Sequence, residues 1–148
     1  NPERSLVERV LKAVPISQIQ FHGNESAQFC RGFGRPYVKS IPVSTDDEMQ
    51  QVMREHSASR AFLFDTVVPG KHGGTGKTFD WTKIPTKNVG HRVLAGGLNA
   101  ENVAEAIRIG APDAVDVSSG VESSAGVKDH DLVRRFIAAA KQAGKEMS

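Results

Sequence analysis

The chain has 148 residues, of which 39% are apolar, and its formal net charge is +2. This apolar content is too high for a disordered chain, and so small a net charge gives no reason to expect nucleic acid or a membrane as a partner. The single cysteine, Cys30, excludes an internal disulfide and suits a protein of the reducing cytoplasm. No stretch reaches transmembrane length, and the first residues show no signal-peptide pattern.

Helices and strands alternate along the first half of the chain. Leu6, Val7 and Val10 recur with helical spacing, which predicts a helix over 2–13 that Asn1 caps. The following residues predict a strand over 18–22, a helix over 25–31 bounded by Asn24 and Gly32, a strand over 37–41, a helix over 46–55 and a strand over 61–65.

The second half continues the alternation after a long loop over 66–77. It predicts a helical turn over 79–84, a strand over 92–95, a helix that Asn99 caps and that ends at Gly110, a strand over 114–117 and a helix over 129–143. We expect the last helix to face the core with Leu132, Val133, Phe136, Ile137 and Ala140. Five strands, each followed by a helix, indicate repeated βα units in a single α/β domain over 1–148.

Carboxylates follow two of these strands. Residues 61–64 are apolar at every position, which is typical of a strand buried on both faces of a parallel sheet, and Asp65 ends the run. At the mouth of an apolar fold this carboxyl group loses hydration, which favours its protonated form, so Asp65 is our candidate acid. The alternative is a structural Asp that caps a turn with Thr66. Asp116 ends the strand over 114–117, where it either orients a substrate hydroxyl or amine or accepts main-chain hydrogen bonds.

Small residues follow the last two strands. Gly96 and Gly97 come after the strand over 92–95, and Ser118, Ser119 and Gly120 come after the strand over 114–117. Glycine lets the main chain bend sharply and approach a ligand, and N–H groups at the start of a helix attract anions. Adjacent loops of this kind indicate a phosphate site. The alternative is a pair of tight turns that need small residues for geometry alone.

The histidines and the cysteine carry weaker signals. His22 ends the strand over 18–22 and would lie at the same mouth, although a lone histidine is more often structural. Cys30, beside Phe29 and Phe33, is interpreted as a small buried hydrophobic residue. The other histidines show no metal-binding spacing, so we expect no metal site; they are His56, His72, His91 and His130.

The loop over 69–78 is rich in glycine and resembles a phosphate-binding P-loop. Four residues must separate the first glycine of that motif from its Gly-Lys-Thr, but Gly70 leaves five and Gly73 leaves two. A nucleotide-binding P-loop therefore fails on spacing. A glycine-rich lid over a phosphate ligand, with Gly74 in it, fits better than a plain surface connection.

Five motifs together resemble one family. They are QFHG at 20–23, FLFDT at 62–66, GGTGKTFDW at 73–81, LAGGL at 94–98 and VDVSSGVE at 115–122. In this combination they resemble phosphoribosylanthranilate isomerase of tryptophan biosynthesis. The resemblance implies a (βα)8 TIM barrel, of which this chain supplies only about five βα units, strands four to eight. The family's first strand carries a Lys-Ile-Cys-Gly motif whose cysteine is the general base, and Cys30 does not match it.

The resemblance also implies a reaction, an Amadori rearrangement of N-(5'-phosphoribosyl)anthranilate that requires no metal or organic cofactor. Asp65 would protonate the furanose ring oxygen, and a base would then remove the proton at C2'. The phosphate would be held by Gly96, Gly97, Ser118, Ser119 and Gly120, with the loop over 73–76, which contains Gly74, closing above. We list His22 and Asp116 as further candidates for substrate binding.

Two consequences are expected for the isolated chain. Because the general base has no counterpart here, we expect the chain alone to be inactive. Because a partial barrel leaves strand edges unpaired, we expect self-association or swapping. The alternative is a non-catalytic phosphate-binding half-barrel that a separate amino-terminal segment completes.

Overall fold

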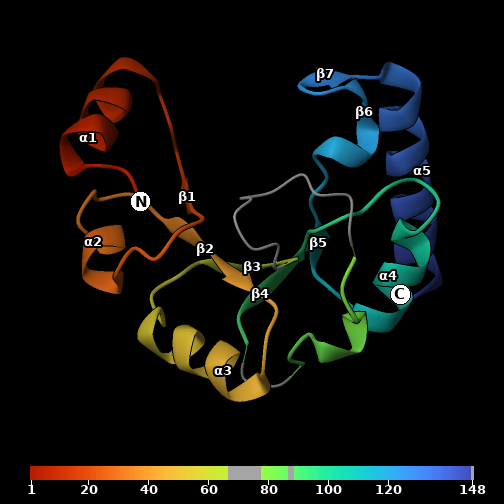
Figure 1. The fold of residues 1–148 in the computed structure, drawn as a ribbon, viewed down its shortest axis with the longest axis horizontal. Coiled ribbons are helices and arrows are strands. Elements are labelled where there is room, and N and C mark those ends of the chain that lie inside the picture. The colour runs from red at the N-terminus through yellow and green to blue at the C-terminus, as the bar shows by residue number, and fades with distance from the viewer. Residues whose placement is uncertain (67–77, 87–88, 148) are drawn as a thin grey trace.

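The computed structural model describes residues 1–66, 78–86 and 89–147. Five strands form one parallel sheet in chain order (Figure 1), namely β1 (Ile19–Phe21), β2 (Tyr37–Pro42), β3 (Ala61–Asp65), β4 (His91–Leu94) and β5 (Ala114–Val115). The helices are α1 (Arg4–Ala13), α2 (Ala27–Arg31), α3 (Asp46–Glu55), α4 (Val103–Gly110) and α5 (His130–Glu146), with 3-10 turns η1 (Trp81–Lys83) and η2 (Ser119–Val121). The predicted α/β fold with a five-stranded parallel sheet is confirmed.

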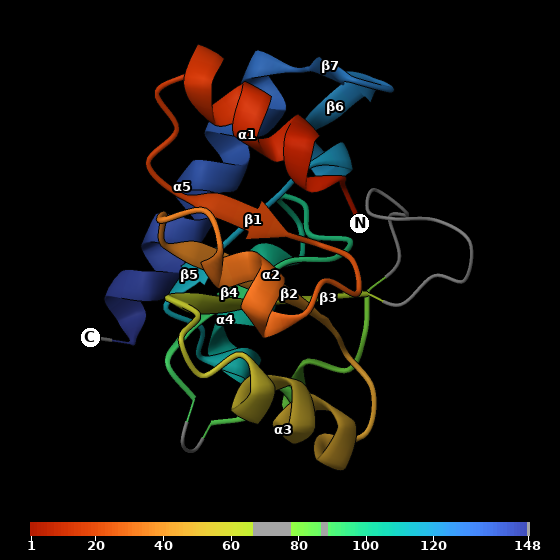
Figure 2. The ribbon, with the colours of Figure 1, turned by 90° about the vertical axis from the view of Figure 1, so that its left-hand side faces the viewer.

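The helices are arranged around the outside of this curved sheet. Figure 1 shows α1 and α2 near β1, α3 below β2 and β3, and α4 and α5 packed together beside β5. Figure 2 shows α1 at the top of the view and α3 at the bottom. None of the helices in the described part of the chain is long and apolar enough to cross a membrane.

Strand β3 is buried on both faces, as its unbroken apolar run predicts. Phe62 and Phe64 pack in the main core with residues of α3 and α4, whereas Ala61 and Leu63 pack on the opposite face. Successive side chains of a strand point to opposite faces. Asp65 therefore leaves the sheet on the face of Ala61 and Leu63, away from the main core.

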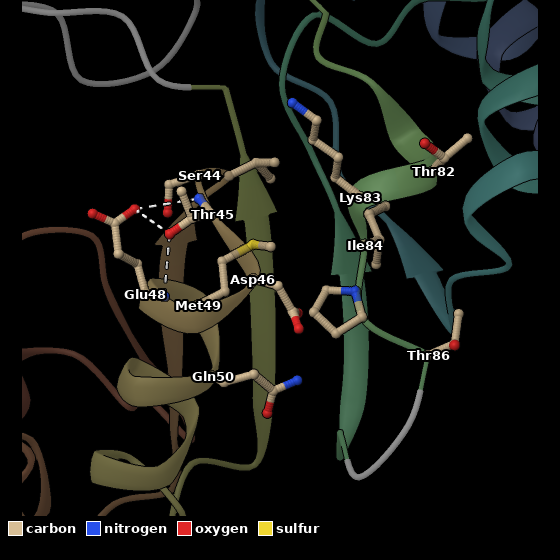
Figure 3. A pocket seen from close by; sticks show the side chains of 12 residues that line it. Ser44, Thr45, Asp46, Glu48, Met49, Gln50, Thr82, Lys83, Ile84 and Thr86 are labelled. Carbon is tan, nitrogen blue, oxygen red and sulfur yellow. Dashed lines mark hydrogen bonds between the residues drawn. The ribbon is translucent and has the colours of Figure 1, made fainter.

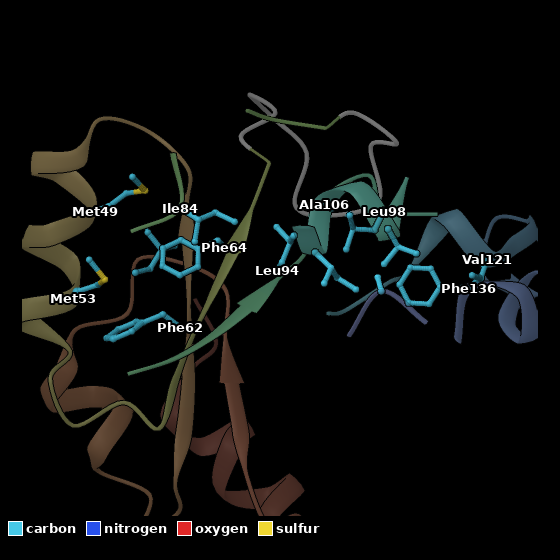
Figure 4. Packing of buried hydrophobic residues seen from close by; sticks show 14 residues of the cluster. Met49, Met53, Phe62, Phe64, Ile84, Leu94, Leu98, Ala106, Val121 and Phe136 are labelled. Atoms are coloured by element: carbon cyan, nitrogen blue, oxygen red, sulfur yellow. The ribbon is translucent and has the colours of Figure 1, made fainter. Parts of the chain in front are cut away.

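The main core joins the sheet to three helices (Figure 4). Met49 and Met53 of α3 pack at one end, and Phe136 of α5 packs at the other. The fully or nearly buried members that the figure labels are Met49, Met53, Phe62, Phe64, Ile84, Leu94, Leu98, Ala106, Val121 and Phe136. The expectation for Ile137 is wrong: it is 46% exposed, because it lies one residue, about 100° of helix, beyond buried Phe136.

The amino end of α1 differs from the expectation. The helix begins at Arg4 with Glu3 at the cap position, not at Pro2 with Asn1 as cap. The Asn1 side chain instead accepts a 2.7 Å hydrogen bond from the amide of Asn24, far along the chain. No residue of α1 is buried, although the helix is strongly amphipathic.

Two other helices also begin later than predicted. Helix α2 begins at Ala27, because Ser26 rather than Asn24 accepts the capping hydrogen bond from the Phe29 amide, at 3.2 Å. Helix α4 begins at Val103, after a turn that the Asn99 side chain holds by accepting hydrogen bonds from the two amides of residues 101 and 102.

A small hairpin follows η2. Strand β6 (Glu122–Ser124) pairs antiparallel with β7 (Val127–Lys128), and Gly126, with φ of 79°, allows the tight turn between them.

Candidate functional site

A cavity of about 410 Å³ opens at the carboxyl ends of the parallel strands. Its lining comprises Gln20, His22, Asp65, Ala95, Gly96, Gly97, Leu98, Asp116, Val117, Ser118, Ser119 and Gly120. The structure thus brings every predicted site residue together except Gly74, which lies outside the described residues. The reason is topological, since the carboxyl ends of parallel strands meet at one edge of a sheet.

Asp65 and His22 are in direct contact. The Nε2 atom of His22 lies 3.2 Å from the Oδ2 atom of Asp65. The other carboxylate oxygen, Oδ1, accepts a 2.7 Å hydrogen bond from the amide of Thr66. Both interpretations of Asp65 therefore have a structural counterpart: one oxygen holds a local turn, and the other faces the histidine.

These two side chains come from strands that are not neighbours. His22 directly follows β1 and Asp65 ends β3, with β2 paired between them. Two strand spacings amount to roughly 10 Å, so only side chains that lean toward each other across β2 can meet. The Asp65 side chain is 12% exposed, whereas the His22 side chain is 38% exposed and lies at the opening.

Gly96 brings the end of β4 against Asp65. Its φ is 79°, in the left-handed region that favours glycine. A Cβ atom here would lie 2.8 Å from Oδ1 of Asp65 and 2.7 Å from the Thr66 amide nitrogen. Any larger residue would have to displace the candidate acid. Gly97, with φ of 64°, continues the turn, and its carbonyl accepts a 3.0 Å hydrogen bond from the side chain of Asn102.

The two glycine loops pack directly against each other. A Cβ atom on Gly120 would collide with the main-chain carbonyl oxygen of Leu98, and it would lie 2.8 Å from the carbon of that group. Glycine at this position is therefore required by the close approach of the loops after β4 and β5.

Main-chain donors are available along these loops. Within the described part of the chain, the amides of Gly96, Gly97, Ser119 and Gly120 donate no hydrogen bond to protein acceptors. Clustered N–H groups without protein acceptors suit an anionic ligand. These N–H groups are therefore available to an anionic ligand.

Lys128 supports the second loop, which sequence reasoning missed. Its ammonium group donates to the carbonyl of Ser118 at 2.9 Å and to the carboxylate of Glu122 at 2.7 Å. Hydrogen bonds from Lys128 and from the Gly126 amide lower the pKa of Glu122. The only sequence signal was the run from Glu122 to Lys128, whose glycine permits the hairpin turn.

Asp116 lies at the edge of the cavity. Its amide donates a 2.8 Å hydrogen bond to the carbonyl of Leu94, which extends the β4–β5 pairing, and its side chain is exposed. Both interpretations of this residue remain open.

A second cavity, of about 720 Å³, lies between the amino end of α3 and η1 (Figure 3). It contains none of the predicted site residues. At its rim the Glu48 carboxylate accepts hydrogen bonds from the side-chain and main-chain donors of Thr45, which lower the pKa of Glu48. This capping box is a helix-start device, so we assign the functional site to the smaller cavity.

Cys30 lies away from the site. It is fully buried with Phe21 and Tyr37, packed against Phe29 and Phe33, and burial raises the pKa of its thiol to about 11. Its interpretation as a buried hydrophobic residue is confirmed. No group of three or more potential ligands in the described ranges could hold a metal ion.

Comparison with known proteins gives one consistent family. The profile of the family described as "N-(5'phosphoribosyl)anthranilate (PRA) isomerase" matches residues 1–139. The isomerase of Acidithiobacillus ferrooxidans is 48% identical over 139 residues, which cover 93% of this chain and 67% of that protein. The isomerase of Legionella pneumophila (strain Corby) is 46% identical and is covered to the same extent, 67%.

Solved structures agree with the sequence relatives. The isomerase of Thermotoga maritima matches with a TM-score of 0.82 at 38% identity, covering 96% of this chain and 70% of that one. A structure of the isomerase in complex with reduced 1-(o-carboxyphenylamino)-1-deoxyribulose 5-phosphate matches with a TM-score of 0.78 at 36% identity, covering 96% and 68%. The parallel α/β sheet is thus TIM-barrel-like, and this chain, which spans about two thirds of its relatives, belongs to the N-(5'-phosphoribosyl)anthranilate isomerase family.

Proposed function

We propose that this chain binds N-(5'-phosphoribosyl)anthranilate and supplies the acid and the phosphate grip for its rearrangement to 1-(2-carboxyphenylamino)-1-deoxyribulose 5-phosphate in tryptophan biosynthesis. The observation that carries this proposal is the 3.2 Å contact between His22 and Asp65 inside a cavity walled by two glycine loops. A relative with 36% identity is described in complex with the reduced form of this product.

The phosphate would be gripped mainly by the main chain. The amides of Gly96, Gly97, Ser119 and Gly120 have no protein acceptors in the described ranges, and Ser118 adds a hydroxyl at the same wall. A grip through amides fits a phosphate, which offers several acceptor oxygens and negative charge.

Asp65 would act as the general acid. It donates a proton to the furanose ring oxygen, the bond from that oxygen to C1' breaks, and the nitrogen lone pair forms an iminium. A base then removes the proton at C2', the electron pair moves into the iminium, and the resulting enolamine tautomerises to the ketone. His22, 3.2 Å from Asp65, would help to hold the acid, and Asp116 would orient a substrate hydroxyl or amine.

The reaction also needs a general base, and these 148 residues offer no thiol suited to that role. Cys30 is buried among aromatic rings, and its raised pKa disfavours the thiolate. We therefore expect no turnover by the purified chain alone, and product formation above the uncatalysed rate would contradict this.

Complementation separates catalysis from plain binding. Co-expression with a chain carrying the family's first three barrel strands should restore turnover, since β1 to β5 would then occupy strands four to eight. If the complex forms and binds the reduced product but stays inactive, the alternative of a non-catalytic phosphate-binding half-barrel holds instead.

The phosphate grip is tested by calorimetric titration with the reduced product. Gly120→Ala, which collides with the Leu98 carbonyl, should weaken binding about tenfold or more, or ~1.4 kcal/mol. Gly90→Ala is the matched control, because its Cβ meets nothing within 4 Å. Equal affinity of the two variants would count against the grip.

Self-association is a further part of the proposal. In the described part of the chain β1 and β5 each pair on one side only. Leu6 and Val10 of α1 and the C-cap residue Val14 are exposed. Unpaired edges and an open apolar face favour association. Sedimentation velocity should therefore show species larger than a monomer, and a compact monomer would contradict this.

A further inference from the structure

A buried ion pair lies behind the strand that carries His22. The Lys39 ammonium is 3.5 Å from the Glu25 carboxylate, and each side chain is only 4% exposed. Neither residue lines the cavity of the candidate site. Charged residues are almost never buried to this extent without a specific partner or role.

Both members of the pair bind the same residue. Lys39 donates a 2.5 Å hydrogen bond to the carbonyl of Gly23, and Glu25 accepts a 3.0 Å hydrogen bond from the Gly23 amide. Gly23 directly follows His22. The main chain next to the histidine is therefore held at its amide and at its carbonyl by two opposite charges.

The pair lies on the side of the sheet away from the cavity. Lys39 is the register partner of Phe21, which packs with Cys30 of α2 and with Tyr37. Side chains alternate along a strand, so His22 leaves the sheet on the opposite side, where it lines the cavity. The ion pair thus fixes the loop from behind while His22 faces Asp65 in front.

Glu25 is held in its charged form. Burial pushes its pKa upward, but main-chain hydrogen bonding and the charge of Lys39 act against burial, and the pKa of Glu25 is lowered. An apolar pair of similar size would avoid the desolvation of two charges. The ionic pair instead supplies what an apolar pair lacks, a donor and an acceptor for the Gly23 main chain.

We propose that Glu25 and Lys39 are positioning residues for the candidate acid: they fix the Gly23 main chain so that the His22 imidazole stays against the Asp65 carboxylate. This role matters for catalysis only if Asp65 is the general acid, so that part rests on the proposed function. The geometric part, the coupling of His22 to Asp65, stands by itself.

The test measures that coupling by NMR on chain labelled with 15N in its histidines. In the parent chain, Asp65→Asn should shift the Nε2 resonance of His22. In the double variant Glu25→Leu with Lys39→Met, the same Asp65→Asn change should leave that resonance unmoved. Replacing both charges avoids an unpaired buried ion, so the double variant is expected to fold.

Two further variants separate positioning from packing. Lys39→Arg keeps a charged donor and should retain the response of His22 to Asp65→Asn. Lys141→Met, on the surface of α5, is the control for loss of a lysine and should also retain it. An equal response in the parent and the double variant would overturn the proposal, and so would loss of the native amide spectrum in the double variant, since the pair would then serve folding.

Adding the reduced product keeps the two proposals distinguishable. If it shifts the amides of Gly97, Ser119 and Gly120 while the His22 coupling persists in the double variant, the positioning role fails and the proposed function stands. If it shifts none of them while the coupling is lost, the positioning role stands and the proposed function fails.

Discussion

Replacing Gly96 by alanine tests how closely the main chain of β4 approaches the candidate acid. Left-handed backbone costs an alanine about 1–2 kcal/mol, of which about 0.4–1 kcal/mol is offset because alanine restricts the unfolded chain. The new Cβ would also lie 2.8 Å from the Asp65 carboxylate and 2.7 Å from the Thr66 nitrogen. Forcing extra volume into such a space costs about 1–3 kcal/mol more.

Gly126 provides a matched control for this substitution. Its φ is also 79°, but a Cβ atom there meets nothing within 4 Å. We therefore expect Gly126→Ala to lower the free energy of unfolding by about 1 kcal/mol or less, and Gly96→Ala by about 2–4 kcal/mol. Urea unfolding measures both, and calorimetry should show weaker binding of the reduced product by Gly96→Ala alone. Equal losses of stability would refute the close approach.

Two other predictions concern groups outside the cavity. Arg92 donates to the carbonyls of Gly110 and Ala111 at the end of α4, so Arg92→Met should lower the free energy of unfolding by about 1–3 kcal/mol in urea. Arg108→Met, whose ion pair is exposed, should change it by less than about 0.5 kcal/mol, and equal effects would contradict the capping role. The folded-state pKa of Cys30 is raised to about 11 from 9.0, so its contribution to stability is complete below about pH 9 and is lost as the pH rises through about 11. Between about pH 9 and 11, urea unfolding should show that the free energy of unfolding falls by roughly 2–3 kcal/mol more in the parent chain than in Cys30→Ala. Parallel pH profiles of the two proteins would contradict this.

The elements that sequence predicted best are those whose signals are local. Helix α3 spans Asp46–Glu55 as predicted, because Thr45 and Glu48 form a capping box at its start. Strand β3 spans Ala61–Asp65 as predicted, because an unbroken apolar run is typical of a strand that is buried on both faces of a parallel sheet. The gathering of the site residues followed from strand topology alone.

The features that sequence missed depend on distant contacts. Asn1 bonds the amide of Asn24 instead of capping α1, which no local pattern indicates. Charged residues such as Lys39 and Glu25 normally indicate an exposed position. Here both side chains are buried, and they pair with each other and with the main chain of Gly23. Such pairings are set by the packing of α2 on β1 and β2, beyond the reach of periodicity.

The corrections to the sequence predictions leave the site unchanged. Ile137 is exposed and the helix starts near Asn24 and Asn99 shift, but none of these residues lines the cavity of Asp65. The position of the candidate acid depends on β1, β3 and β4, whose existence and order the sequence predicted.

A crystal structure of the chain soaked with the reduced product would test the central claim most directly. The predicted result is a phosphate with its oxygens about 2.7–3.2 Å from the amides of Gly97, Ser119 and Gly120, and the Asp65 carboxyl group facing the opened sugar. A phosphate bound in another place, or an Asp65 side chain turned toward solvent, would contradict it.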